Sequence, residues 1–268
     1  LIAQVNVDGL ICVRPSSEDP DWGGPGAVLN IGMNDARLVS LTKAIGASAA
    51  NAIYARFIQS YSIHVARLDP DMFDDMDMDA EDICQQALDA YELEAEEPFP
   101  QDASQQLGGV LRSMARAWGG TSARLLRQAK GAPADAGLGL VVQEMVLGLG
   151  NGECGSGVLQ LVSSTTGLPQ TTGRYLSQSQ GRDALETGAA SLFIEKDSRG
   201  ASLEEQAPVA FEALKAHTAL MREKLREEMQ IEFTIENGEV HILDGVRLPR
   251  SARAAVRIAV QLAHDGII

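Results

Sequence analysis

The sequence contains no apolar run that approaches the roughly 18 residues needed to cross a bilayer, and no signal peptide is visible. Positive charge is also scarce, since 22 Lys and Arg residues face 37 Asp and Glu residues and the formal net charge is −15. This imbalance argues against nucleic acid and anionic membranes as partners, because both reward basic patches. Binding of a small polyanion would then depend on a local positive pocket or on a metal ion.

Cysteine is the next scarce residue. Cys12, Cys84 and Cys154 are far apart, odd in number and without the C-x-x-C spacing of redox or zinc sites. They are expected to be buried reduced thiols in a cytoplasmic protein. The mean hydropathy of −0.06 and the hydrophobic content of 45% are those of an ordinary globular protein, and 268 residues suffice for one large domain or two lobes.

The pattern of apolar residues and turn signals predicts a mixed α+β fold rather than a regular strand–helix alternation. Capping residues predict helix starts at Asp102 or Ser104, at Ser202 with Glu205 three residues on, and at Ser251. Asn237-Gly238 between two alternating runs predicts a hairpin. Helices are also predicted over 35–66 and 81–95, strands over 138–147 and 155–162, and two short strand pieces around an Asp-Gly turn over 4–13.

Five short runs, in this order along the chain, resemble the N-terminal ATP-grasp domain of the pyruvate phosphate dikinase family. They are VLNIGMND (28–35), FPQD with a following QL (99–107), VVQEMV (141–146), IEFTIENG (231–238) and the closing AAVRIAVQLAHDGII. The resemblance is colinear over 13–268. It implies an ATP-grasp-like fold of two mixed α/β lobes with a small helical insertion.

The same resemblance implies a division of the chain. The first lobe is expected over 1–36 and 98–136, the helical insertion over 37–97, and the second lobe over 137–268, which ends in the hairpin and the last helix.

Site residues are implied by the same resemblance. ATP and Mg²⁺ are the expected cofactors. The resemblance assigns phosphate binding to Arg14 and to the loop glycines Gly23, Gly24 and Gly26. It assigns adenine binding to Gln143, Met145 and Val146, and metal binding to Glu232 and Asp244. Glycine amides can approach phosphates closely, and carboxylates are preferred Mg²⁺ ligands. Glu232 and Asp244 stand at similar distances from the Asn237-Gly238 turn, so they are expected to lie side by side.

Several positions depart from the family pattern. Val246 replaces the Arg of a Gln-Thr-Arg run, Val162 lies where a Thr-Arg-Asn-Pro run has its cation, and Arg174 and Arg182 each replace a Glu. One hypothesis is that Arg174 or Arg182 pairs with Asp244. The acidic run over 74–86 resembles a calcium loop at first sight, but it lacks the required Gly and Glu and is better explained as a solvated helix start.

Three functions remain open. The first is a dikinase-like ATP-grasp domain with lost or weakened phosphotransfer. The second is a working ATP-binding half that passes phosphate to a partner protein with a phosphohistidine domain, since residues 1–268 contain neither that motif nor the pyruvate-binding barrel. The third is a regulatory or scaffold protein that binds another anionic small molecule in the old cleft through Arg14, Arg174 and Arg182.

Overall fold

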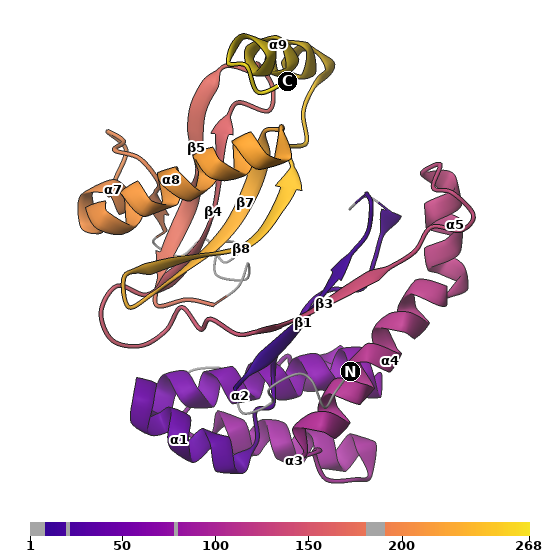
Figure 1. Cartoon of the computed structure of the whole chain (residues 1–268). Coiled ribbons are helices and arrows are strands. Elements are labelled where there is room, and N and C mark those ends of the chain that lie inside the picture. The colour runs from indigo at the N-terminus through magenta and orange to yellow at the C-terminus, as the bar shows by residue number, and fades with distance from the viewer. Residues whose placement is uncertain (1–8, 20–21, 78–79, 181–190) are drawn as a thin grey trace. The chain divides into compact units, whose positions relative to one another are not determined.

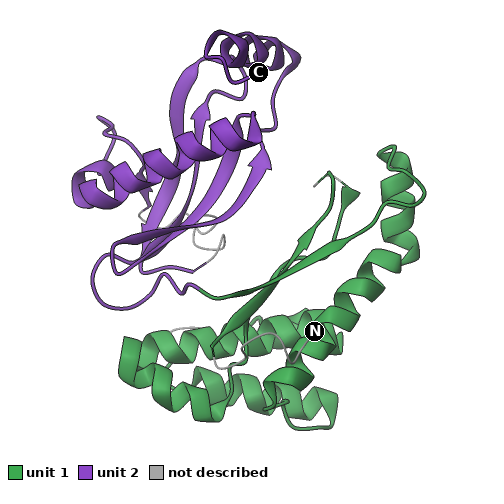
Figure 2. Cartoon of the chain, in the orientation of Figure 1, with its two compact units in different colours: residues 1–145 green, residues 146–268 purple. Residues whose placement is uncertain are grey.

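The computed structural model describes all residues except 1–8, 20–21, 78–79 and 181–190. The chain divides into two units, residues 1–145 and 146–268, which Figure 2 colours separately. The boundary falls later than the expected start of the second lobe at residue 137, because the strand over 139–144 pairs within unit 1. Within the described part of the chain, no helix is long and apolar enough to cross a membrane.

Unit 1 contains a three-stranded antiparallel sheet in the order β2-β1-β3 (Figure 1). Its strands are β1 (Ile11–Ser16), β2 (Val28–Ile31) and β3 (Gly139–Glu144). The register of β1 and β3 runs without a break from Ile11 opposite Glu144 to Ser16 opposite Gly139. The expected Asp-Gly turn at residue 8 lies outside the described residues.

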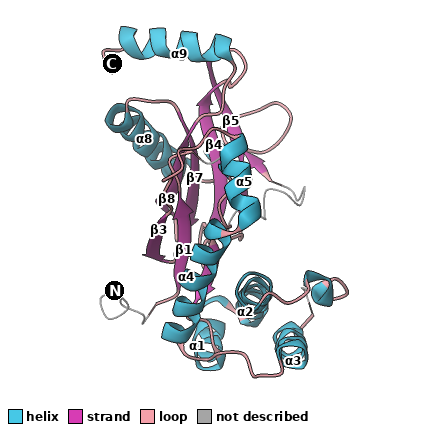
Figure 3. Cartoon of the chain, turned by 90° about the vertical axis from the view of Figure 1, so that its right-hand side faces the viewer, coloured by secondary structure: helices cyan, strands magenta, loops and turns pink. Residues whose placement is uncertain are grey.

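The helices of unit 1 fall where the periodicity predicts them, except that the helix predicted over 35–66 is broken at Gly46 and ends in a π-helical turn. They are α1 (Asp35–Ile45), α2 (Ala47–Tyr61), the π-helical turn η3 (Ser62–Ala66), the 3-10 turn η4 (Pro70–Phe73), α3 (Ile83–Ala95), α4 (Ala103–Gly119) and α5 (Thr121–Ala129). Gly46 separates α1 from α2 with a φ of 91°, and Gly120 separates α4 from α5 (Figure 3). Asp102 is the cap of α4, since its side chain accepts a hydrogen bond from the backbone N–H of Gln105 at 2.7 Å.

Two of the recognisable runs hold unit 1 together. Phe99 of the FPQD run is buried among four aromatic rings in edge-on contacts, the nearest being Tyr91 with a centroid distance of 5.1 Å. Gln106 accepts a hydrogen bond from Gly32 N–H at 2.7 Å and donates to the Met33 carbonyl at 2.9 Å. The FPQD and VLNIGMND runs are therefore joined through a buried glutamine, which satisfies polar groups that would otherwise be costly to bury.

Unit 2 contains a five-stranded antiparallel sheet in the order β6-β5-β4-β7-β8. Its strands are β4 (Gly155–Val162), β5 (Pro169–Ser177), β6 (Leu192–Phe193), β7 (Met229–Glu236) and β8 (Glu239–Arg247), and its helices are α7 (Leu203–Gln206), α8 (Pro208–Leu225) and α9 (Ala252–His264). The two antiparallel sheets with their helices confirm the mixed α+β class.

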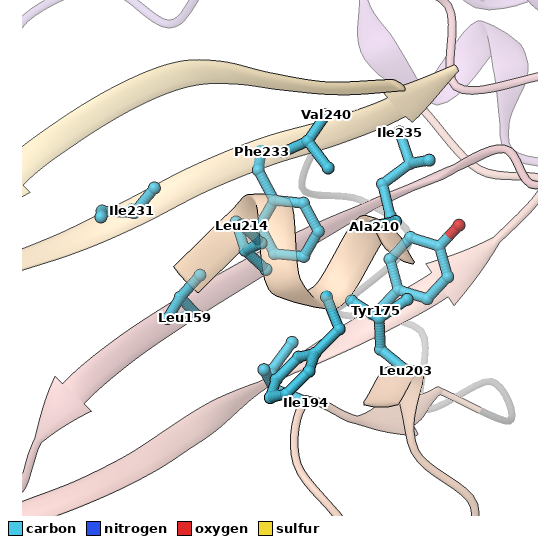
Figure 4. Packing of buried hydrophobic residues seen from close by; sticks show 11 residues of the cluster. Leu159, Tyr175, Ile194, Leu203, Ala210, Leu214, Ile231, Phe233, Ile235 and Val240 are labelled. Carbon is cyan, nitrogen blue, oxygen red and sulfur yellow. The ribbon is translucent and has the colours of Figure 1, made fainter. Parts of the chain in front are cut away.

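The core of unit 2 lies between α8 and one face of its sheet (Figure 4). Alternate residues of the strands supply it, as expected where one face of a sheet is covered. Tyr175 and Phe233 are stacked with ring centroids 6.0 Å apart. The other core residues are Leu159, Ile194, Leu203, Ala210, Phe211, Leu214, Ile231, Ile235 and Val240.

The predicted hairpin and the predicted caps of unit 2 are confirmed. Asn237 and Gly238 connect β7 to β8 with φ values of 52° and 82°, which fit the two-residue turn that favours Asn-Gly. Ser202 caps α7, where it accepts from Glu205 N–H and donates to the Glu205 carboxylate. Ser251 caps α9 by accepting from Ala254 N–H at 3.1 Å.

Candidate functional site

The face of the unit 2 sheet opposite α8 carries a row of side chains from four strands. The strand register places Arg174 of β5 opposite Val158 of β4, Val158 opposite Glu232 of β7, and Glu232 opposite Asp244 of β8. The neighbours Ile231 and Phe233 belong to the core under α8, so Glu232 points to the other face. We call this face of unit 2 the open face.

Glu232 and Asp244 are Cα partners and lie side by side as expected. The turn register alone, with Phe233 opposite Ile242, would place Leu243 opposite Glu232. A β-bulge between Glu232 and Phe233 shifts the register by one residue and brings Asp244 there.

The Asp244 side chain is exposed and accepts a hydrogen bond from Gly245 N–H at 2.8 Å. No group of three or more His, Cys, Asp or Glu residues in the described chain could hold a metal ion. Two carboxylates still fit Mg²⁺, which commonly takes one or two protein carboxylates and fills its shell with water and substrate phosphates.

The two positions where the resemblance expects phosphate-binding arginines are apolar. Val246 stands opposite Gln230. It lies two residues from Asp244 along β8 and therefore on the same face of the sheet. Val162 is only 9% exposed and packs in a cluster with Leu248 and Ile258 of α9. No positive charge is therefore present at either position.

The hypothesis that Arg174 pairs with Asp244 is wrong. The guanidinium carbon of Arg174 lies 3.8 Å from the ring centroid of Phe193 in β6. β6 adjoins β5 at the edge of the sheet, whereas Asp244 lies on β8 at the opposite edge. The alternative partner, Arg182, falls outside the described residues.

In unit 1, Arg14 and Gln143 lie on neighbouring strands and meet at Cys12. Cys12 stands opposite Gln143, and Arg14 follows two residues along β1 on the same face. Burial raises the pKa of the Cys12 thiol, while the charge of Arg14 and hydrogen bonds from Arg14 and Gln143 act in the opposite direction. All three cysteines are free and buried, as expected.

The glycines of the loop between β1 and β2 have different surroundings. Gly23 has a φ of 66°, and a Cβ there would lie 2.5 Å from Leu126 Cδ2 of α5. A Cβ at Gly24 would lie 3.9 Å from the Trp118 ring, an ordinary contact, whereas one at Gly26 would meet nothing within 4 Å. Gly26 is therefore the one of the three whose backbone leaves room for a ligand to approach.

Arg127 of α5 is a cation that the sequence reasoning missed. It is only 8% exposed, its Nη2 donates to the Trp118 carbonyl at 2.8 Å, and its guanidinium carbon lies 3.8 Å from a Trp118 ring centroid. Its Nη1 is buried without a hydrogen-bond partner among the residues that the structure describes. Helical periodicity gives no signal for it, because the neighbouring Leu125 and Leu126 are exposed while Arg127 is buried.

The residues assigned to adenine fall at the boundary between the two units. Gln143 belongs to β3, and Met145 N–H continues the β1–β3 ladder by donating to the Leu10 carbonyl at 2.8 Å. The chain passes from unit 1 to unit 2 between Met145 and Val146. An adenine slot at these residues stays a prediction.

Comparison with known proteins gives a consistent result, although no protein-family model matches the chain. Pyruvate, phosphate dikinase from Rhizobium meliloti is 31% identical over 286 residues, and the alignment covers 97% of this chain and 32% of the relative. The chain is homologous to pyruvate, phosphate dikinase. The dikinase of Clostridium symbiosum is 28% identical, and the chloroplastic dikinase of Flaveria pringlei is 26% identical, again over 97% of the chain.

The dikinase alignments extend across both units, so both belong to one homologous region. The chain spans about a third of the length of the dikinases that it matches. This extent is consistent with the N-terminal ATP-grasp portion that the five runs suggested.

Proposed function

We propose that this chain is a dikinase-like ATP-grasp domain in which ATP phosphotransfer is weakened or lost. The observation that carries the proposal is the pair of valines at the expected arginine positions. Val162 packs in an apolar cluster under α9, and Val246 places an isopropyl group beside the Glu232–Asp244 pair. Neither side chain can donate a hydrogen bond to a phosphate oxygen.

The size of the expected defect follows from the chemistry. Phosphoryl transfer depends mainly on positioning and on neutralising the charge of the phosphates. Each charge-assisted hydrogen bond contributes about 1.5–3 kcal/mol, so the loss of two weakens nucleotide binding by several kcal/mol. Every 1.36 kcal/mol missing from the transition state costs a factor of about ten in rate.

What the chain retains has a defined role in this proposal. Glu232 and Asp244 would hold Mg²⁺, which supplies charge neutralisation at phosphate oxygens. Arg14 offers a guanidinium group on β1, and the unobstructed backbone at Gly26 offers an amide to an incoming phosphate. These groups would position a nucleotide weakly rather than drive its transfer.

Calorimetric titration with ATP and MgCl₂ tests the proposal. The wild-type chain is expected to show no metal-dependent binding in the micromolar range, and micromolar binding would contradict the proposal. The variant Val246→Arg restores the cation at the end of the Gln-Thr-Arg run and keeps both carboxylates, so it is expected to gain affinity about tenfold or more. Val209→Arg adds the same charge at an 81% exposed position of α8 and is the matched control, expected to gain nothing.

A second function is supported by the Glu232–Asp244 register and by the Arg127 Nη1 donor, which has no hydrogen-bond partner among the described residues. In this alternative the chain is a working ATP-binding half that passes phosphate to a phosphohistidine-domain protein on another chain. It predicts that label from ATP reaches a purified dikinase fragment carrying that domain, and that Glu232→Gln abolishes the transfer. Metal-dependent binding together with this transfer would replace the first proposal by the second.

A further inference from the structure

A hollow of about 280 Å³ lies at the β6 edge of the unit 2 sheet, apart from the Glu232–Asp244 pair on β7 and β8. Three cations line it, namely Arg174, Lys196 and Arg199, together with the carboxylates of Glu195 and Asp197. This local excess of positive charge stands out on a chain whose net charge is −15. A small anion in the surrounding solvent would be attracted to such a local excess of positive charge.

One of the three cations is already neutralised. Arg199 holds Asp197 in a two-point contact, with Nε 2.9 Å from Oδ1 and Nη2 2.6 Å from Oδ2. Hydrogen bonds from Arg199 lower the pKa of Asp197 to about 2, so this pair stays charged over the whole neutral range. Arg199 therefore lines the hollow but is occupied by Asp197 and is not its ligand-binding group.

Arg174 and Lys196 remain for a ligand. Arg174 makes no salt bridge with a described residue and packs its guanidinium on Phe193 at 3.8 Å. Stacking occupies the face of a guanidinium group and leaves the N–H groups in its plane free to donate. Lys196 has only a 3.9 Å contact with Glu205, and its side chain is 71% exposed.

The strand edge beside these cations adds neutral donors and acceptors. Among the described residues, β6 pairs with β5 only at Arg174 and Tyr175. The outer edge of Thr171, Thr172 and Gly173 therefore carries main-chain groups that no described strand pairs, and all three residues line the hollow. An unpaired edge of this kind is normally satisfied by water or by a ligand.

We propose that the hollow binds a small dianion, a phosphate monoester or a dicarboxylate, through Arg174 and Lys196. Arg174 and Lys196 can each donate to one anionic group of the ligand, since guanidinium and ammonium groups favour phosphate and carboxylate oxygens. With Glu195 counted, the lining keeps a net charge of +1 after Arg199 and Asp197 neutralise each other. The volume lies just below the range of about 300–1,000 Å³ that is typical of pockets for drug-sized ligands, so a molecule smaller than a nucleotide fits best.

Titration of the full chain with sodium phosphate and, separately, with sodium succinate tests the proposal at low ionic strength and without metal or nucleotide. At least one of the two is expected to bind, and the stronger one identifies the ligand class. Arg174→Gln and Lys196→Gln should each weaken binding about tenfold. Lys224→Gln is the matched control, since Lys224 is 69% exposed and lies 3.7 Å from Glu223 in the same unit, and it should leave affinity unchanged.

Amide shifts in ¹⁵N NMR spectra locate the ligand independently of the variants. Shifts confined to Thr171–Gly173 and to Lys196 and its neighbours are expected, and saturating ATP should not reverse them. Absence of binding by both probes below roughly 10 mM would overturn the proposal. The proposal would also be overturned if Arg14→Gln abolished anion binding while Arg174→Gln did not, because the anion would then lie in unit 1. That result leaves the question of nucleotide phosphotransfer untouched.

Discussion

The two faces of the unit 2 sheet are made by the same strands but differ in what they carry. The face under α8 is apolar and closely packed, with Leu159, Ile231 and Phe233 at its centre. The open face alternates with it and carries Glu232 and Asp244. Because successive side chains of a strand point to opposite faces, residues of the open face can change while the core is kept. Homology to dikinases is therefore compatible with the proposed loss of phosphate-binding cations from one strand pair.

The largest expected change in stability comes from Phe233 of β7, and its neighbour Glu232 on the other face provides the comparison. Phe233→Ala should destabilise unit 2 by about 3–5 kcal/mol, because a ring that is 1% exposed leaves a cavity beside Tyr175. Glu232→Gln should have a clearly smaller effect, because the half-buried side chain lies outside the core and the substitution keeps its volume. Urea unfolding followed by circular dichroism measures both, and tryptophan fluorescence reports unit 1, where Trp22 and Trp118 lie. Equal effects of the two substitutions would contradict the contrast between the faces.

A smaller effect is expected from the ion pair that anchors the open ends of the hairpin. Arg250 donates two hydrogen bonds to Glu227, at 2.6 and 2.7 Å, and Arg247 adds a third contact at 2.9 Å. Glu227→Gln should cost about 1–2 kcal/mol at pH 7. If the free energy of unfolding fell by less than about 0.3 kcal/mol, the turn alone would hold the two strands in register.

The stability contributed by Glu227 should depend on pH. Burial is the largest single influence and raises the pKa of Glu227, but hydrogen bonds from Arg250 and from the Glu228 N–H, together with the charges of Arg250 and Arg247, hold the pKa below its usual value of 4.5. The contribution is thus complete above about pH 4.5 and is lost as pH falls through the folded-state pKa. The wild type and Glu227→Gln should accordingly converge in stability on acidification, which a series of urea titrations at falling pH would measure.

The turn that sets the register gives the next prediction. Asn237 occupies the left-handed region at a φ of 52°, so Asn237→Ala should cost about 1 kcal/mol. A slip of one residue would exchange the two faces, because it moves every core side chain of the slipped strand to the other side. Gly238→Ala, at a φ of 82°, provides a second test of the same turn by thermal unfolding. Unchanged melting temperatures for both variants would rule out the turn as the determinant of register.

The smallest effect on stability is expected in unit 1, at the glycine loop. Gly26→Ala should leave the melting temperature unchanged, because a Cβ there meets nothing within 4 Å, whereas Gly23→Ala should lower it. If this loop approaches phosphates, Gly26→Ala should still weaken any residual nucleotide binding. The pair of variants separates a role in ligand approach from a role in packing.

Much of the fold could be predicted from local signals. The Asn-Gly hairpin, the caps at Asp102, Ser202 and Ser251, and the strand over 155–162 all depend on residues close in sequence. The boundary between the units was harder to predict, because β3 joins unit 1 through pairing with β1, more than a hundred residues earlier. Arg127 was missed for a related reason, since its burial depends on Trp118 and not on the pattern of its own helix.

The amino-acid sequence was sufficient to establish the family likeness and the hairpin, because a two-residue turn sets how two adjacent strands align near it. The β-bulge that brings Asp244 opposite Glu232 was visible only in the structure. Tertiary packing was needed to show that Arg174 stacks on Phe193 instead of reaching Asp244, and that Val162 is buried under α9. Strand order and helix packing bring together residues far apart in the chain. No local pattern encodes which of several strands an exposed arginine will face.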